Sequence, residues 1–457
     1  MLGLLAAACS FNAPTSMTPQ QEFNEIFAAA GMPVPKRLQG VREPPALWQR
    51  SREVTWNSSK QFFDWYYIYV RDVEEKRAWA FTYLMSRCGK DAAGRTDGCK
   101  YGGAWPGFVT MEPGEAAVSY VEQHELAAWR ASGATQSATI LSRTGSTNMT
   151  ISAPHSDGSV VHLSGTLGTR AAAWRDEGGL GASPISWDLK VARRAGWFGE
   201  SWVEQPFHLG EKMGAIMWSP YGHMGTVVGS ITVRGRTFKL GGDEGRYRAY
   251  CDSNWGTHMP RPPPGGEAID YPWGWYYAAR PSADLKADVS IICGAGRTSY
   301  WLTGSVYGKL CDLRVGAGFR LSLWSWTFDR LGKTASWASD SDELQGVESF
   351  EITRGGWVNW TDGYGEARVP MAQQLSIVTR KHQISLNFSA TRNATSRLVF
   401  PSEDTLFSDF EALGAIAAVE VRERKLEGGG AGRVVASFVD DMAGLEFGYR
   451  VGEEPPK

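Results

Sequence analysis

Runs of alternating apolar and polar side chains recur along most of this chain, and this period of two constrains its fold more than any other feature. Residues 61–73 read QFFDWYYIYVRDV, and residues 158–167, 225–242 and 319–329 alternate in the same way. Successive side chains of a strand point to opposite faces, so each run predicts a β-strand. Most of the 53 glycines separate such runs, where they favour turns.

Many short strands with few helical patterns predict an all-β fold. The chain has 457 residues, which is long enough for two such units. We therefore expect two consecutive antiparallel β-barrel or sandwich domains, with a boundary near residues 205–215, where the alternation is interrupted. The predicted parts are an N-terminal arm or signal-like segment over residues 1–40, a first β domain over 41–210 and a second over 211–457.

Three segments have helical character. A short helix is expected near Pro19–Ala30 in the N-terminal arm. Residues 115–132 and 404–421 also favour helix, although the second segment is equally compatible with the start of a strand.

Charge and motif content exclude several classes of function. The formal net charge is −2 and no basic stripe is present, which argues against a nucleic-acid partner. No run approaches the ~18 apolar residues of a membrane span. No Cys/His cluster has zinc spacing, and there is no P-loop or H-E-x-x-H motif. We therefore expect no metal, no cofactor and no integral membrane span, and the sequence leaves the oligomeric state open.

The six cysteines and the sequons bear on the compartment. Cys88 and Cys99 bracket a polar loop, while Cys293 and Cys311 bracket a segment that reads as two strands and a turn. Each pair could form a hairpin disulfide, but the spacing does not determine the connectivity. Five N-x-S/T sequons and a short apolar N-terminus favour the secretory pathway or an organelle lumen.

The chain contains 20 tryptophans, and several are clustered. On a strand, Trp65 and Tyr67 face one side, and so do Trp273 and Trp275. Filling a core explains many individual tryptophans. An aromatic wall also suits sugars, apolar polyenes or carbocations, because the ring face attracts positive charge.

One acid lies among these aromatic residues. Residues 250–256 read YCDSNWG, which places Asp252 and Asn254 on the same face of an extended segment. Desolvation raises the pKa of a carboxyl group, so Asp252 could remain protonated near neutral pH and act as an acid. The alternative interpretation is that Asp252 and Asn254 only cap a turn.

The central part of the chain resembles the tocopherol cyclase family and the wider superfamily of two-domain, lipocalin-like proteins. That superfamily includes carotenoid 1,2-hydratases, the AttH-like group and fungal Diels–Alderases. The resemblance lies in a strand pair with a G-x-x-F turn, then Y-x-D-x-N-W-G, a proline and W-x-W. The matching segments are 218–242, 246–260 and 271–281, with looser matches in FFDWYYIYV at 62–70, PISWDLKV at 184–191 and FVDDMAGLEFGYR at 438–450.

The resemblance implies two successive lipocalin-like barrels with a deep apolar pocket near their junction. In the hydratases the matching acid is thought to protonate a carbon–carbon double bond, a role that would fall on Asp252, with Asn254 beside it. Tocopherol cyclases close a ring on a prenylated quinol, and the Diels–Alderases hold a polyene in a reactive conformation. The first strand lacks the expected glycine after Asp64, and the loop over residues 257–270 is long, so this sequence leaves the substrate open.

We therefore predict a cofactor-free intramolecular cyclase acting on a prenylated quinol, terpenoid or polyene. Asp252 would donate the proton, and Asn254 would position it or the substrate. The predicted substrate-binding residues are Trp65, Tyr67, Trp218, Tyr250, Trp255, Trp273, Trp275 and His223.

The sequence leaves two other functions open. One is a non-catalytic carrier of an apolar, lipid-like ligand, and the other is a secreted glycan-active protein, which would need a second carboxylate. Glu446 of the closing segment is expected to pair with an arginine. By resemblance, a plastid location is a further alternative.

Overall fold

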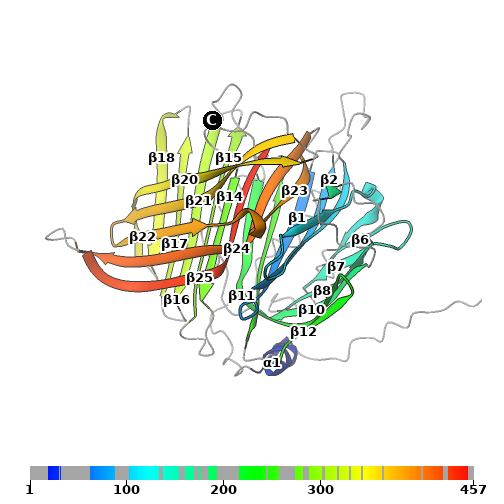
Figure 1. The fold of residues 1–457 in the computed structure, drawn as a ribbon. Helices are drawn as coiled ribbons and strands as arrows, with labels where there is room; N and C mark the ends of the chain where they lie inside the picture. Colours follow the sequence, from blue (N-terminus) through cyan, green and yellow to red (C-terminus); the bar gives the residue numbers. More distant parts are fainter. Residues whose placement is uncertain are drawn as a thin grey trace, which may run out of the picture.

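In this computed structural model the chain forms two large antiparallel β-sheets (Figure 1). Buried side chains of both sheets form one shared layer. The residues described are 19–29, 31, 62–87, 102–132, 137–153, 160–168, 174–175, 184–192, 216–242, 245–256, 273–280, 288–300, 304–315, 319–328, 331–340, 343–362, 365–402, 405–425 and 431–450.

The first sheet has 13 strands in the order β5-β6-β7-β8-β10-β11-β13-β1-β2-β3-β4-β9, and β12 pairs with β11. Their bounds are β1 Phe62–Asp72, β2 Arg77–Arg87, β3 Gly103–Met111, β4 Val118–Val121, β5 Trp129–Ser132, β6 Ser137–Leu141, β7 Asn148–Ser152, β8 Val160–Leu167, β9 Trp174–Arg175, β10 Ile185–Ala192, β11 Ile216–Val233, β12 Arg236–Leu240 and β13 Tyr247–Gly256.

The second sheet has 12 strands in the order β19-β18-β17-β16-β15-β14-β25-β24-β22-β21-β20, and β23 pairs with β24. Their bounds are β14 Trp273–Arg280, β15 Val289–Tyr300, β16 Gly304–Val315, β17 Phe319–Phe328, β18 Lys333–Asp340, β19 Glu343–Gln345, β20 Val347–Asp362, β21 Gly365–Thr379, β22 His382–Ser389, β23 Thr395–Ser402, β24 Thr405–Arg424 and β25 Ala431–Arg450. The predicted all-β fold of two antiparallel units with few helices is confirmed.

The first sheet includes strands on both sides of the predicted domain boundary. Residues 205–215 themselves lie outside the described residues. β10 ends at Ala192, and β11, which begins at Ile216, pairs with it in the same sheet. The last strand of the first sheet ends at Gly256, and β14 opens the second sheet at Trp273. The change of sheet therefore falls between Gly256 and Trp273, later in the chain than the predicted boundary.

The expected helix of the N-terminal arm is present as α1, Pro19–Ala29. It lies against the first sheet, near β12 in Figure 1. Glu22 of α1 accepts a hydrogen bond from Lys190 Nζ at 2.7 Å and lies 2.8 Å from His162 Nε2. These contacts from β10 and β8 hold the helix on the sheet.

The other two segments with helical character form mainly strands. Residues 115–132 contain β4, the short 3-10 turn η2 at Leu126–Ala128, and β5. Residues 404–421 fall almost entirely within β24, which pairs with β22, β23 and β25. The helix prediction is wrong for both segments, because pairing with neighbouring strands outweighs local helix propensity.

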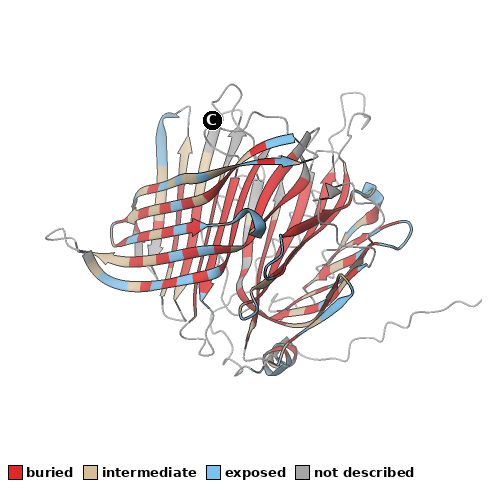
Figure 2. Cartoon of the chain, in the orientation of Figure 1, coloured by how far each residue is buried: buried red, intermediate tan, exposed pale blue. Residues whose placement is uncertain are grey.

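Side-chain alternation sorts the residues of β1 into two cores. Tyr66 and Ile68 face the core enclosed by the first sheet. Trp65, Tyr67 and Tyr69 face the opposite way, into the layer shared with the second sheet. Both β1 and β14 are buried along most of their length (Figure 2). We call this shared layer, formed mainly by β1, β2, β3 and β14 with further residues of β13, β24 and β25, the inter-sheet layer.

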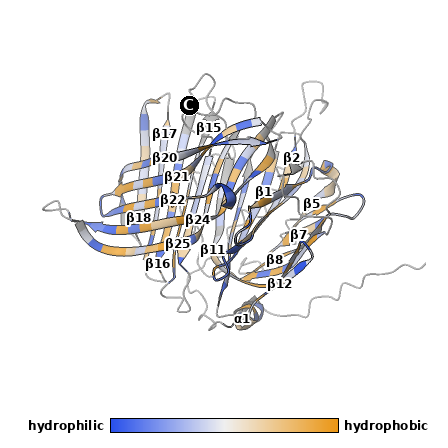
Figure 3. Ribbon diagram, in the orientation of Figure 1, coloured by the Kyte–Doolittle hydropathy of each residue, from blue (hydrophilic) through white to orange (hydrophobic). Residues whose placement is uncertain are grey.

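Strands farther from this layer have one exposed face. β22 reads HQISLNFS and alternates buried and more exposed residues along its whole length. The alternation of hydrophobic and hydrophilic residues is visible on β21 and β22 in Figure 3. A strand with one solvated face is typical of antiparallel sheets, so the fully buried β1 and β14 mark the contact between the two units.

Polar side chains of β1 bind the second sheet at every second position. Tyr67 Oη donates to Glu411 Oε1. Tyr69 Oη donates to the carbonyl of Met442 at 2.7 Å, and Arg71 Nη1 donates to Asp440 Oδ2 at 2.7 Å. The Arg71 and Asp440 side chains are only 1% and 5% exposed. These contacts fix the position of one sheet on the other.

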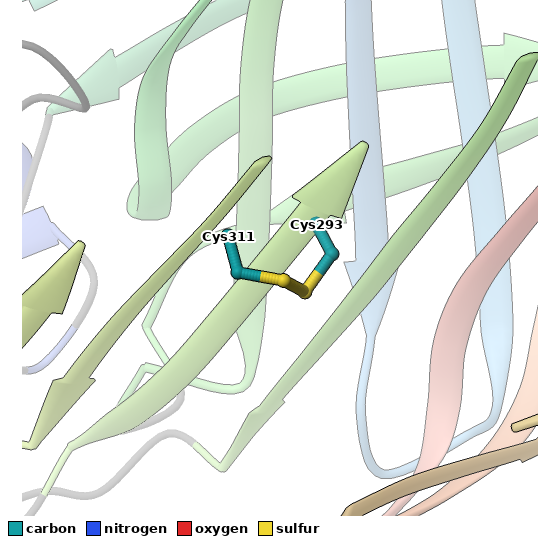
Figure 4. Close-up of a disulfide and its surroundings, with 2 residues drawn as sticks. All are labelled: Cys293 and Cys311. Carbon is teal, nitrogen blue, oxygen red and sulfur yellow. A yellow bond between two sulfur atoms is a disulfide. The ribbon is translucent and has the colours of Figure 1, made fainter. Parts of the chain in front are cut away.

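A disulfide links Cys293 and Cys311, which lie directly opposite each other on β15 and β16 (Figure 4). This is one of the two pairs that the sequence suggested. The other candidate pair, Cys88 and Cys99, lies outside the described residues.

Replacing Arg71 by leucine should destabilise the protein strongly. The change would leave the Asp440 carboxylate buried without its ion-pair partner, which costs about 3–5 kcal/mol. Lys76→Ala is the matched control, because Lys76 and Asp441 form an ion pair with both side chains about half exposed and worth at most about 1 kcal/mol. Urea denaturation of the two variants measures the difference. If both variants lose the same small amount of free energy of unfolding, the role assigned to Arg71 is contradicted.

Removing the disulfide with the double substitution Cys293→Ser and Cys311→Ser should lower the free energy of unfolding by about 3 kcal/mol, because the bond closes a loop with a sequence separation of 18 residues. Thermal denaturation of the variant and of the wild type, each with and without a reductant, measures the effect. A reductant that lowers the melting temperature of both proteins equally would contradict it.

Candidate functional site

Asp252 lies near one end of β13, between β11 and β1. Its register partners are Tyr67 on β1 and Pro220 on β11. The β11 register is irregular immediately after Pro220. A proline cannot donate a ladder hydrogen bond, and such irregularities often reorient nearby side chains. Trp218, two residues before Pro220, reaches back to Asp252.

One oxygen of the Asp252 carboxyl receives two hydrogen bonds. Trp218 Nε1 donates to Oδ2 at 2.8 Å, and Tyr250 Oη donates to the same atom at 2.7 Å. The second oxygen, Oδ1, is buried and has no hydrogen-bond partner among the described residues. The residue is only 4% exposed. This arrangement leaves one oxygen of a dry carboxyl available to a ligand.

Burial controls the protonation of this group. Desolvation raises the pKa of Asp252 to about 7, and the hydrogen bonds from Trp218 and Tyr250 oppose the rise. No cation is among the described groups that act on it. The sequence predicted both this direction and its cause, since burial disfavours the charged form.

Aromatic rings surround Asp252 on the side of the inter-sheet layer. The ring of Tyr250 lies 5.0 Å from that of Trp275 and 6.3 Å from that of Tyr67, centroid to centroid. Trp65 and Trp273 meet edge to face at 6.1 Å, and Trp273 stacks on Phe407 at 4.0 Å. Trp65 and Tyr67 face this layer together, as do Trp273 and Trp275, so the predicted shared faces are confirmed.

Two glycines of β25 make room for these tryptophan rings. A Cβ atom at Gly444 would clash with the Trp275 ring, and one at Gly448 would clash with the Trp273 ring. Glu446 lies between the two glycines on the same face of the strand. Its carboxyl accepts a hydrogen bond from Trp273 Nε1. Among the described residues Glu446 therefore has an indole partner and not the arginine expected from the sequence.

Two further buried carboxyl groups lie near Glu446 on β24. Glu411 is its register partner, and Asp409 is opposite Gly448. Burial raises the pKa of both groups, and the charge of Glu446 raises each further. Burial also raises the pKa of Glu446, followed by the charge of Asp252. The inter-sheet layer thus contains four acids that favour their protonated forms.

The remaining predicted site residues are placed only in part. Asn254 is half-buried on β13, opposite Trp218 in register. Trp255 and His223 lie on β13 and β11, but their side chains are outside what the structure describes. Exposure increases from Tyr250, which is 0% exposed, through Asp252 to the half-buried Asn254. Asp252 therefore lies near the rim of the buried layer.

Sequence reasoning missed Asp409 and Glu411 because their segment favoured helix. Read as a strand, residues 404–421 would have placed both acids on one face with Phe407 and Leu413. That alternation is the signal that could have identified them.

A hollow of about 490 Å³ lies elsewhere, over β20, β21, β22 and β24, and none of the predicted site residues lines it. Within the described residues no helix is long and apolar enough to cross a membrane. In the same ranges, no three His, Cys, Asp or Glu side chains are grouped so that they could hold a metal ion.

Comparison with known proteins finds similarity at the level of structure. No family model and no curated protein matches the sequence. The structure is similar to CghA in complex with Sch210972, with a TM-score of 0.47 and 9% identity over 86% of this chain and 89% of that one. It is also similar to a protein described as AttH from Nitrosomonas europaea, with a TM-score of 0.43 and 11% identity over 90% of this chain and 97% of that one.

The fold and the site define a two-sheet, all-β protein with a buried acid and an aromatic wall at the sheet contact. At these identities and TM-scores the similarities assign neither a family nor a function to this chain.

The stability of the protein should fall as the pH rises. The folded state raises the pKa of Asp252 from 3.8 to about 7 and so binds this proton more tightly than the unfolded chain does. The contribution of this bound proton to the free energy of unfolding is fully present below pH ~4 and is lost as the pH rises through ~7. It amounts to a few kcal/mol. Urea denaturation between pH ~5 and ~8.5 should show that the free energy of unfolding falls more steeply with pH for wild type than for Asp252→Asn. Asp188→Asn, at an exposed position on β10, should behave like wild type, and a parallel loss in all three proteins would contradict the assignment.

Proposed function

We propose that the protein is a cofactor-free intramolecular cyclase that uses Asp252 as a proton donor. The observation that supports this most directly is the state of the Asp252 carboxyl. It is buried, one oxygen is held by Trp218 and Tyr250, and the other has no partner among the described residues. An acid with a pKa near the operating pH is the most effective general acid.

The aromatic wall suits the intermediate that such a donor would create. Protonation of an alkene produces a carbocation, and the faces of Trp275 and Tyr67 in the same layer would stabilise positive charge by the cation–π effect. A dry layer also prevents water from capturing the cation. The substrate class that fits is a prenylated quinol, a terpenoid or a polyene, whose flexible chain must be held in one conformation.

The two hydrogen bonds to Asp252 also determine which of its oxygens would carry the proton. Trp218 and Tyr250 occupy Oδ2, so a proton carried by the carboxyl would reside on Oδ1. A substrate at the rim beside Asn254 would meet that oxygen, and the Asn254 amide would be available to bind a substrate oxygen. A plain carrier would have no need for an unsatisfied buried acid, which costs free energy.

Turnover of a panel of prenylated quinols, terpenoids and polyenes tests the proposal. Wild type should convert a member to an isomer of equal mass, and Asp252→Asn should lose about 10²- to 10⁴-fold in rate. In D₂O the wild-type product should carry deuterium at the former alkene carbon. Asp188→Asn, on an exposed face of the first sheet, serves as the control and should retain the wild-type rate.

Other outcomes assign other functions. Equal isomerisation by wild type and Asp252→Asn, without deuterium in the product, would identify a pericyclase that works by shape alone. Tight binding without product would identify a carrier of apolar ligands. Either result would overturn Asp252 as the proton donor.

The rate should also fall at high pH. Asp252 donates only when protonated, so activity should decline as the pH rises above ~7, the value to which burial raises its pKa. A rate that stays constant between pH ~6 and ~9 would contradict the assignment.

A further inference from the structure

We propose that Glu446 is a second proton-carrying residue of this site and forms an acid–base pair with Asp252. One carboxyl gives a proton to the substrate, and the other takes up the proton that the substrate loses. The chemistry of this pair rests on the proposed function, whereas its existence can be tested without any substrate.

The strand geometry directs the two acids into the same layer from opposite sheets. Glu446 lies on β25, opposite Trp275 in register. The Trp275 ring is 5.0 Å from the Tyr250 ring, and Tyr250 Oη bonds Asp252 Oδ2. The charge of Glu446 acts on Tyr250, and the charge of Asp252 acts on Glu446. The two carboxyl groups are thus electrostatic neighbours across one aromatic layer.

The groups around Glu446 are acids and aromatic residues. Asp409 and Glu411 face it from β24, and Tyr67 from β1 binds Glu411. Tyr250 and Asp252 of β13 interact with it electrostatically. On β14 the adjacent side chains are Trp273 and Trp275.

The arginines of the layer act elsewhere. Arg71 pairs with Asp440, and Arg248 donates to the carbonyl of Tyr247 at 3.2 Å. Both affect the pKa of Tyr277, and neither is among the groups that act on Asp252 or Glu446. Without a cation beside them among the described residues, two close buried carboxylates cannot both ionise cheaply, so the pair retains a proton.

Unsatisfied oxygens give a second, independent indication that the layer receives another molecule. Asp252 Oδ1 and Glu411 Oε2 are both buried without a hydrogen-bond partner among the described residues. Buried polar atoms in native proteins are normally bonded, and exceptions often have a functional reason. The two atoms come from opposite sheets.

An acid–base pair completes the proton balance of a ring closure. The O–H bond of the protonated acid breaks as a C–H bond forms at the alkene. The substrate hydroxyl oxygen then bonds to the cationic carbon, and its own O–H bond breaks as its proton passes to the ionised acid. Transfer of that proton back across the pair restores the starting state, and the net reaction is an isomerisation.

Kinetics of Glu446→Gln test the catalytic part. The reactive form holds one proton on the pair, so the wild-type rate should fall at low pH, where both acids are protonated, and at high pH, where both are ionised. Glu446→Gln should lower the rate about 100-fold and abolish the fall at low pH. A purely structural role for Glu446 would lower the rate but leave the shape of the pH profile unchanged, and this result would overturn the pair.

Infrared titration tests the pair without substrate. The C=O band of protonated carboxyl groups is followed with pH in wild type, Asp252→Asn, Glu446→Gln, the double variant and Asp188→Asn. The difference between wild type and Glu446→Gln isolates the band of Glu446, and the difference between Asp252→Asn and the double variant isolates the same band without Asp252. The midpoint of the Glu446 band should lie at lower pH in the second comparison than in the first. An identical midpoint in both backgrounds would overturn the pair.

Asp252→Asn alone gives the answer if Glu446→Gln does not fold. A step of the wild-type band other than the one that Asp252→Asn itself removes should then shift to lower pH, while Asp188→Asn should leave every step in place. If this coupling is found but no panel member is turned over, the pair stands and the proposed cyclase function fails. If Asp252→Asn abolishes turnover but the coupling is missing, the function stands and the pair fails.

Discussion

The contact between the two sheets depends on the alternation of side chains along β1. Its odd-numbered residues leave the core of the first sheet and enter the inter-sheet layer, where Tyr67, Tyr69 and Arg71 bind acceptors on the second sheet. A shift of one residue in register would turn all of these side chains to the opposite face. The same alternation on β13 directs Asp252 into this layer. The fold and the protonation of the acid therefore share one physical origin.

Desolvation then decides what the layer can do chemically. An aspartate in water is ionised at neutral pH, but burial among Trp218, Tyr250 and the rings behind them favours the neutral acid. The second sheet adds Glu446, which accepts a hydrogen bond from Trp273, and Gly444 and Gly448 leave room for the tryptophan rings beside β25. Elsewhere in the same layer, Arg71 neutralises Asp440. Within the described ranges the layer therefore has one end where charges are paired and an acidic end where they are not.

Much of the fold and part of the site could be predicted from the sequence. The period of two predicted the strands, the shared faces of Trp65 with Tyr67 and of Trp273 with Trp275, and the environment of Asp252. The sheet to which β11, β12 and β13 belong could not be predicted, because strand pairing is a long-range choice that local patterns do not encode. Asp409 and Glu411 were missed because their segment has helical propensity, and the partner of Glu446 depended on which strand lies beside β25.

The central claim is that Asp252 holds a proton near neutral pH, and its most direct test is a ¹³C NMR titration of the aspartate side-chain carboxyl groups. Comparison with Asp252→Asn assigns the signal. The account predicts a titration midpoint for Asp252 near 7, the value to which burial raises its pKa. A midpoint near the ordinary value of ~4 would show that the carboxyl is ionised at neutral pH and would contradict its role as the acid.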